Sequence, residues 1–194
     1  MTKTKFFRTV LFAGAAVTLF SFDVPAGWFK SGDKANSYDM GISKGAGRDG
    51  KNAVTILSTD KTIEGFGTLM QNCLPGKYLE KRIRMTGYMK SQDVAQWASF
   101  WLRVDQLNSQ ELLAFDNMED RPIKGTTDWK KYEIVLDVPQ KASNIAYGGL
   151  LVGTGQIWFD NLTFEIVDNS VPVTRKVNDP SLPHKEPTNL DFEK

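Results

Sequence analysis

The sequence predicts an all-β protein folded as a single sandwich or barrel domain. From residue 27 to about residue 168, short β-type runs alternate with breaks rich in Gly, Pro, Asn and Asp, and this spacing is typical of sandwiches and barrels. Helical periodicity is scarce, and the one helical candidate is a turn or two near Gln92–Ala95. The length of 194 residues leaves room for one domain with shorter flanking segments.

Nine runs carry the β pattern. In chain order they are Ser37–Ser43, Ala53–Ser58, Gly65–Gln71, Lys81–Lys90, Trp97–Asp105, Glu111–Phe115, Trp129–Val138, Ile145–Val152 and Gln156–Val167. Side chains of a strand alternate between its two faces. We therefore expect Ile83, Met85 and Met89 to share the apolar face of their run.

A glycine-rich stretch separates the first two runs. Gly45, Gly47 and Gly50 have the spacing G-x-G-x-x-G, which in dinucleotide-binding proteins lies between a strand and a helix. Here the β-branched, alternating run Ala53–Ser58 follows instead of a helix. The stretch is therefore predicted to be a hairpin loop.

The N-terminus has the pattern of a secretory signal. Lys3, Lys5 and Arg8 precede an uncharged run over residues 10–22, which is too short to span a bilayer as a helix. Val24-Pro25-Ala26 offers a cleavage site, so residues 1–26 are predicted to be a signal peptide. A buried first element of the fold is the alternative. Export would place the protein outside the cytoplasm, either secreted or periplasmic.

The composition restricts the function. The formal net charge of +1 argues against bulk electrostatic binding to nucleic acid or to an anionic membrane. The single Cys excludes an intrachain disulfide and any multi-thiolate metal site. The single His lies at position 184 in a Pro-rich segment over residues 169–194, which we expect to be a linker or a loosely bound tail.

Three stretches resemble jelly-roll, galactose-binding-like domains of the carbohydrate-binding-module kind. They are Gln71–Tyr78, Trp129–Pro139 and Gly155–Phe164. Gly65–Gln71 and Phe115–Trp129 look more narrowly like an uncharacterised bacterial domain that occurs alone or attached to AraC-type regulators and secreted enzymes. The resemblance covers residues 27–168 and implies a jelly-roll sandwich of two antiparallel sheets. It is weak evidence for function, because this fold hosts many functions.

One departure from this resemblance concerns the tail. A string that often forms the first strand of such modules, N-L-D-F-E, here lies near the C-terminus at Asn189–Glu193. Residues 188–193 could therefore supply a missing edge strand in cis, or donate a strand to a protein partner. A disordered tail with a chance match is the third reading.

Aromatic and polar side chains share single faces of two predicted strands. The candidate ligand-binding residues are Trp97, Trp101, Arg103, Asp105, Tyr88 and Arg84. If both faces line one concave sheet, aromatic rings would lie beside hydrogen-bonding groups. This combination suits sugars, whose C–H faces stack on rings while their hydroxyls take polar partners. The alternative is that Trp97 and Trp101 belong to a core, and both faces of their run are expected to be covered at least in part.

Residues for catalysis are few. Asp116, Glu119 and Asp120 cluster in one predicted loop, but glycoside cleavage needs two carboxylates facing each other at a defined separation. Ordinary turn formation, with Arg121 neutralising the acids, also accounts for them.

The resemblance also implies a structural calcium ion. The matching positions are Asp160 and, if the tail fills the first strand, Glu193. Calcium takes six to eight oxygen ligands, so two carboxylates do not establish a site. A hydrogen bond from Asp160 to a turn backbone is the alternative, and no other cofactor is expected.

Together these observations predict an exported, non-catalytic binding module whose ligand is a carbohydrate. No nucleic acid partner is expected, and no membrane association after signal cleavage. Two alternatives stay open: a structural sandwich that holds a protein partner through its edge or tail, and a small carbohydrate-active hydrolase or lyase.

Overall fold

The computed structural model describes residues 21–107, 109 and 112–174, and most of them lie in nine strands. The strands are β1 (Phe29–Ser31), β2 (Tyr38–Ser43), β3 (Ala53–Ser58), β4 (Phe66–Cys73), β5 (Lys81–Asp105), β6 (Leu112–Asp116), β7 (Ile123–Val138), β8 (Asn144–Val152) and β9 (Gln156–Val167). The helices of the described residues are two single 3-10 turns, η1 (Ala35–Ser37) and η2 (Gly76–Tyr78). The predicted all-β class is confirmed.

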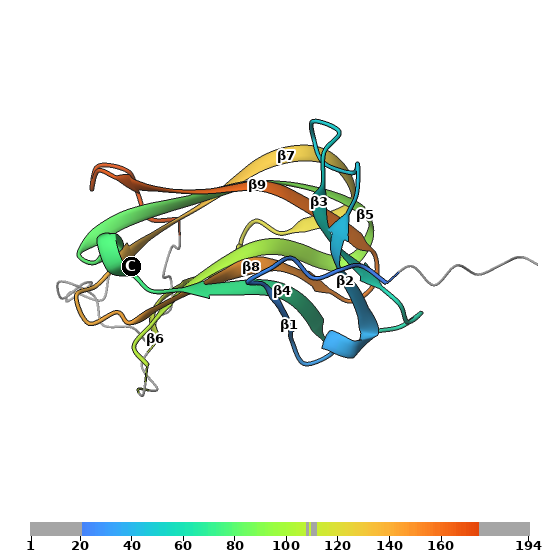
Figure 1. Ribbon diagram of the computed structural model, residues 1–194, viewed down its shortest axis with the longest axis horizontal. Coiled ribbons are helices and arrows are strands. Elements are labelled where there is room, and N and C mark those ends of the chain that lie inside the picture. Colours follow the sequence, from blue (N-terminus) through green and yellow to red (C-terminus); the bar gives the residue numbers. More distant parts are fainter. Residues whose placement is uncertain (1–20, 108, 110–111, 175–194) are drawn as a thin grey trace, which may run out of the picture.

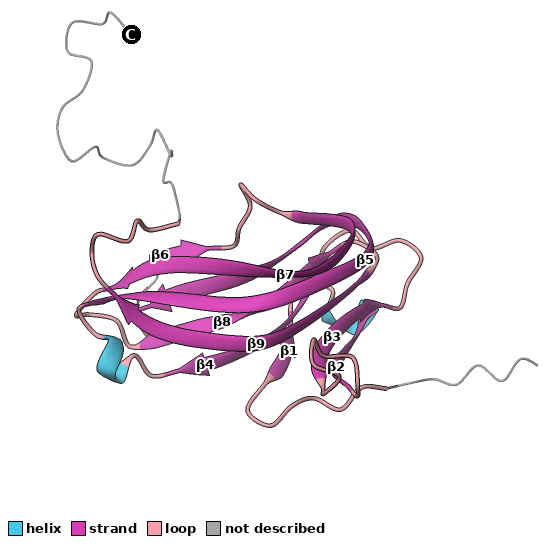
Figure 2. Ribbon diagram, turned by 90° about the horizontal axis from the view of Figure 1, so that it is seen from above, coloured by secondary structure: helices cyan, strands magenta, loops and turns pink. Residues whose placement is uncertain are grey.

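The strands form two antiparallel layers that face each other across the core (Figure 1). One layer has the order β1-β4-β8-β5-β6, and the other has the order β7-β5-β9-β3-β2. The long strands β5, β7, β8 and β9 run along the long axis of the molecule when it is seen from above (Figure 2). This is the jelly-roll sandwich that the sequence predicted.

The strand β5 belongs to both layers. Its 25 residues cover two of the predicted runs, which are continuous in the structure. Residues 82–92 pair with β9, and residues 97–105 pair with β8. The first half of β5 therefore has its outer face on one side of the molecule, and the second half has its outer face on the opposite side.

The helical turn predicted near Gln92–Ala95 is wrong, because these residues continue β5. Against β7 the register shifts between Ser91 and Val94, and Asp93 has a φ of 52°. These are the marks of a bulge, which bends a strand and breaks its alternation. The interrupted alternation imitates a helical turn in the sequence, although pairing with two neighbouring strands holds the backbone extended.

The core fills the space between the layers with side chains of alternating strand positions. Ile83, Met85 and Met89 are at most 1% exposed, which confirms the predicted apolar face. From the other half of β5, Phe100 meets Phe159 of β9 edge to face, with ring centroids 5.7 Å apart. Each large apolar side chain buried in this way contributes about 1.5–3 kcal/mol to the free energy of unfolding.

The glycine-rich stretch forms the hairpin loop that the sequence predicted. It joins β2 to β3, which pair in register from Tyr38–Ser58 to Ser43–Ala53. Gly45 and Gly50 have φ angles of 71° and 78°, a backbone region that side chains with a Cβ rarely enter. The strand that follows leaves no helix N-terminus for a pyrophosphate.

The segment before β1 contacts β2. The Asp23 carbonyl accepts a hydrogen bond of 2.8 Å from the Ile42 amide, and the Phe22 amide donates to the Asp39 carboxylate. The strand β1 itself, paired with β4, was missed because a three-residue run carries no periodic signal. Residues 22 and 23 fall within the predicted signal peptide, and cleavage after Ala26 would remove their contacts.

The predicted tail begins with a segment fastened to the body. Thr174 donates its backbone N–H to the Val135 carbonyl on β7. Arg82 donates to the carbonyls of Asn169 and Val171. Residues 169–174 are thus held against β5 and β7, while His184, Glu193 and the edge strand predicted at 188–193 lie outside the described residues.

Tyr38 links the two layers at one end of the sandwich. It lies on β2, is 3% exposed, and donates its hydroxyl to the Gly153 carbonyl beyond β8 at 2.8 Å. Burial, with the nearby Asp33 carboxylate, raises the pKa of Tyr38 to about 12. The phenol therefore stays a hydrogen-bond donor throughout the neutral range.

We expect Tyr38→Phe to lower the free energy of unfolding by about 1 kcal/mol, the usual effect of one buried hydrogen bond. Urea denaturation followed by tryptophan fluorescence measures this difference. Tyr88→Phe is the matched control, because the Tyr88 ring lies at the surface beneath Arg48. Equal losses in the two variants would contradict a role for the Tyr38 hydroxyl.

A candidate ligand-binding groove

A groove crosses the outer face of the layer β1-β4-β8-β5-β6. Its volume is about 450 Å³, within the range of small-molecule sites. The residues that line it are Phe29, Ser31, Phe66, Thr68, Met70, Asn72, Trp97, Trp101, Arg103, Phe115, Asn117, Leu150 and Val152. Because side chains alternate along strands, this set takes every second residue of β4 and, in the second half of β5, Trp97, Trp101 and Arg103 without Ser99 and Asp105. We call this feature the groove.

The groove has an apolar floor that is separate from the main core. Met70, Trp101, Ala146 and Leu150 form a second buried cluster, and Trp97, Phe115 and Val152 pack against it. Along β5, the intervening residues Ala98, Phe100, Leu102 and Val104 point into the main core. Both faces of this strand are therefore covered, as the sequence predicted.

Trp101 is the fixed ring of the floor. It is 7% exposed, and its indole N–H donates to the Thr68 hydroxyl oxygen at 2.8 Å. The Thr68 hydroxyl in turn donates to the Gly149 carbonyl at 2.7 Å. This chain of hydrogen bonds ties β5 to β4 and β8, so the ring is held without a bound ligand. Trp97, four residues earlier, is only partly buried.

Polar side chains lie along the groove. Arg103 is exposed, and its Nε is 3.0 Å from the Asp105 carboxylate, which Asn144 also contacts. Asn72 and Asn117 contribute amide groups from β4 and from the residue after β6. Asp105, a predicted ligand residue, lies outside the lining and orients Arg103 instead.

The structure does not bring Tyr88 and Arg84 to the groove. Both lie on the first half of β5, in the other layer. Tyr88 stacks beneath the Arg48 guanidinium, 3.7 Å from its ring centroid, and Arg84 pairs with Glu165 at 2.9 Å. The prediction that Tyr88 and Arg84 line the same concave face as the tryptophans is therefore wrong. The reason is that β5 passes from one layer to the other between residues 92 and 97.

Several groove residues were missed by the sequence analysis. Phe66, Met70 and Asn72 share one face of β4, and Phe115 and Asn117 flank the end of β6. Alternation within the predicted run Gly65–Gln71 could have placed Phe66 and Met70 on one face. Their position beside Trp97 and Trp101 depends on strand order, which the sequence does not show.

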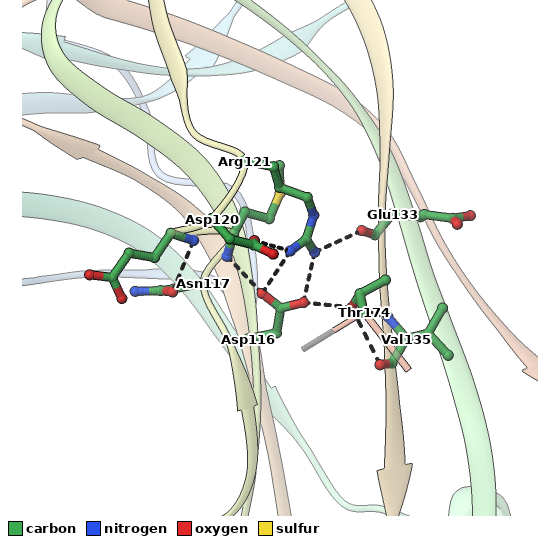
Figure 3. A network of polar contacts seen from close by, with 9 residues as sticks. Asp116, Asn117, Asp120, Arg121, Glu133, Val135 and Thr174 are labelled. Carbon is green, nitrogen blue, oxygen red and sulfur yellow. Dashed lines mark hydrogen bonds and ion pairs between the residues drawn. The ribbon is translucent and has the colours of Figure 1, made fainter. Parts of the chain in front are cut away.

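The acidic loop after β6 is a turn (Figure 3). The Asp116 carboxylate accepts hydrogen bonds from the Met118 amide at 2.7 Å and from Arg121 at 2.7 Å. Asp120 pairs with the same Arg121, and Glu119 is exposed. No two of these carboxylates face each other across a cleft, so the geometry follows the turn interpretation.

The pKa of Asp116 is lowered. Burial acts to raise this pKa, but the hydrogen bonds from Arg121, Thr174 and the Met118 amide outweigh burial. A carboxyl whose pKa is depressed on folding stabilises the folded state above its unfolded pKa, and this contribution is lost as the pH falls through the folded value. Asp116 is therefore ionised and fully engaged at neutral pH.

The proposed calcium position has no acidic cluster around it in the described part of the chain. No group of three His, Cys, Asp or Glu residues there could hold a metal ion. Asp160 accepts hydrogen bonds from the backbone amides of Arg48 and Asn161. It thus fastens the hairpin loop between β2 and β3, while Glu193 lies outside the described residues.

The chain is similar to one curated regulator. No family model matches the chain. It is 42% identical over 168 residues, or 86% of its length, to YbfP of Bacillus subtilis (strain 168), described as an uncharacterized HTH-type transcriptional regulator. The match covers 56% of that protein, so the chain spans little more than half the length of this relative.

Solved structures share the fold. The CBM22-1 xylan-binding domain from Paenibacillus barcinonensis Xyn10C aligns with a TM-score of 0.54 and 13% identity, covering 74% of this chain and 88% of that domain. The Stig cyclase Fisc from Fischerella sp. TAU aligns with a TM-score of 0.52 and 11% identity, covering 76% and 88%. The fold is thus the jelly roll of carbohydrate-binding modules, and it also occurs in a cyclase.

Neither 3-10 helix in the described residues has the length or the apolar content needed to cross a membrane. The expectation of export stays a prediction.

We expect Trp101→Phe to lower the free energy of unfolding by about 1–2 kcal/mol, because it removes the N–H that donates to Thr68. Urea denaturation measures the loss. Trp97→Phe is the matched control, since it makes the same substitution in the same row of β5. A loss in Trp97→Phe as large as in Trp101→Phe would show that indole size, and not this hydrogen bond, sets the cost.

Proposed function

We propose that this chain is a non-catalytic binding module and that its groove binds carbohydrate. The observation that carries the proposal is the pair Trp97 and Trp101 on the outer face of a five-stranded layer, with Asn72, Arg103 and Asn117 beside them. Sugar rings present C–H faces that stack on aromatic rings, and their hydroxyls need donors and acceptors. The groove supplies both kinds of contact.

The dimensions of the groove suit an extended ligand. Its lining residues come from five neighbouring strands, in the order β1, β4, β8, β5 and β6. Four spacings of about 4.8 Å between strands give a length of about 19 Å across the layer. A chain of several sugar units fits this length better than a single monosaccharide, so oligosaccharides are the proposed ligands.

The absence of catalysis is part of the proposal. Among the described residues that line the groove, none is Asp, Glu or His, the side chains that most often act as general acids and bases. The cyclase with this fold keeps an enzyme as the alternative. Product release from a bound glycan would favour that alternative over simple binding.

The relative suggests how such a module is used. A regulator that contains a similar region would combine DNA binding with a domain that senses a small ligand. We propose that the domain described by residues 21–174 supplies ligand recognition, and that the attached segments decide what the recognition controls.

The sharpest test is glycan binding by the purified protein and two tryptophan variants. On a glycan array, and by calorimetry with xylohexaose as a soluble probe, Trp97→Ala should weaken binding by tenfold or more, the loss of about 1.4 kcal/mol of contact. Trp158→Ala is the control, because Trp158 lies on the other layer beside Lys90.

The unfolding midpoint of Trp97→Ala should stay close to that of the wild type, since Trp97 is only partly buried. No binding to any glycan by the wild type would refute carbohydrate binding. Binding that survives Trp97→Ala unchanged would place the ligand elsewhere.

Export is proposed on the basic and apolar pattern of residues 1–22. Expression of the full chain in a bacterial host should give a shortened protein outside the cytoplasm, with its new N-terminus at or before residue 27. N-terminal sequencing of the fractions measures this. A full-length product confined to the cytoplasm would contradict the signal peptide.

A further inference from the structure

Asp116 lies between two residues of the groove wall. It is the last residue of β6, and its neighbours Phe115 and Asn117 both line the groove. Because alternate residues of a strand face opposite sides, the Asp116 side chain points the other way, into the interior. Its side chain is 4% exposed. Any contact that holds Asp116 therefore also sets the backbone from which Phe115 and Asn117 project.

The Asp116 carboxylate is held from two separate parts of the chain (Figure 3). Within its own turn it receives the Met118 amide and two guanidinium nitrogens of Arg121, at 3.3 and 2.7 Å. From 58 residues away, the Thr174 hydroxyl donates to Oδ2 at 2.5 Å. Hydrogen bonds to an ionised carboxylate are about twice as strong as neutral ones.

Thr174 is itself fixed to β7. Its backbone N–H donates to the Val135 carbonyl, and its hydroxyl oxygen accepts the Val135 amide at 2.9 Å. Arg82, bidentate with Asp137, also holds the carbonyls of Asn169 and Val171. Arg121 Nη2 also reaches β7, where it donates to the Glu133 carbonyl at 3.3 Å. The Thr174 hydroxyl and Arg121 Nη2 therefore both contact the Asp116 carboxylate and β7, and Thr174 is the contact that comes from segment 168–174.

The strand β6 has few backbone pairs to fix it, although Leu113 and Ala114 pack against the main core and Phe115 packs against the second cluster. It pairs with β5 at four positions, and the register is irregular between Val104 and Asp105. Among the described residues it pairs with no second strand. A short edge strand of this kind opens more easily than the core. The contacts of Asp116 therefore contribute much of what fixes the position of the groove wall.

We propose that Asp116, Arg121 and Thr174 form a latch through which the C-terminal segment 168–174 positions the groove wall at Phe115 and Asn117. Thr174 is then a positioning residue for the ligand, without touching it. Coupling between two sites acts in both directions. A ligand that holds Phe115 and Asn117 in place must therefore also strengthen the contacts of segment 168–174. The effect on affinity rests on carbohydrate binding by the groove.

The latch is tested with Thr174→Val, which keeps the shape of the side chain but removes its hydroxyl, and with Thr174→Ser, which keeps the hydroxyl. Hydrogen exchange measured by mass spectrometry should show amides of residues 112–118 exchanging about tenfold faster in Thr174→Val, as expected for one lost charge-assisted hydrogen bond. Thr174→Ser should resemble the wild type. Thr163→Val is the control, because it removes a hydroxyl pair with Thr86 on the other layer.

The second measurement is the affinity for xylohexaose by calorimetry. Thr174→Val should bind about fivefold more weakly or worse, the lower range of coupling between sites, while Thr174→Ser binds normally. Saturating xylohexaose should slow exchange at Thr174 and Val135 in the wild type.

The outcomes separate the two proposals. Unchanged exchange over residues 112–118 in Thr174→Val, or the same increase in Thr174→Ser, overturns the latch whether or not a glycan binds. A wild type that binds no glycan, together with faster exchange in Thr174→Val alone, refutes carbohydrate binding and leaves the latch supported. Normal affinity in Thr174→Val despite faster exchange overturns the link to the ligand.

Discussion

The structure depends on one strand, β5, whose 25 residues pair with β6, β7, β8 and β9. A strand that crosses from one layer to the other connects the two sheets through its own backbone. It also forms hydrogen bonds with strands of both sheets. It must also bend, and the bulges between residues 89 and 98 provide the bend. The side chains on its outer face then divide into two sets that can never meet: Arg84 and Tyr88 on one side of the molecule, Trp97 and Trp101 on the other.

The groove follows from the same constraint. The second half of β5 lies between β8 and β6 in a five-stranded layer, so its outward tryptophans lie on the outer face beside side chains of β4, β8 and β6. Thr68 satisfies the indole N–H of Trp101, and an unpaired donor at this depth would cost free energy. The result is an apolar cluster outside the main core, with the buried Thr68 hydroxyl bonded to Trp101 and the amide and guanidinium groups lying along the groove. Exposed apolar patches of this kind often mark binding sites, which supports the ligand groove proposed above.

The acidic turn shows why a cluster of carboxylates in a sequence is weak evidence for catalysis. Asp116 is buried, and its oxygens are occupied by Arg121, Thr174 and a backbone amide. These hydrogen bonds lower the pKa of Asp116. They give the carboxylate a structural role, in which it holds the turn and segment 168–174 together. These contacts connect two parts of the protein. The chain neighbours of Asp116 are the groove residues Phe115 and Asn117, and Thr174 belongs to segment 168–174.

The sequence alone determined the all-β class, six of the nine strands within two residues, the hairpin between β2 and β3, and the sharing of one face by Trp97, Trp101 and Arg103. These are local properties, since alternation and turn residues are written in consecutive positions. Only the tertiary structure decided that Tyr88 and Arg84 lie on the far side, that Phe66 and Phe115 join the tryptophans, and that Thr174 reaches Asp116. Those facts depend on strand order and on the bend in β5, which arise from hydrogen bonds between residues far apart in the chain.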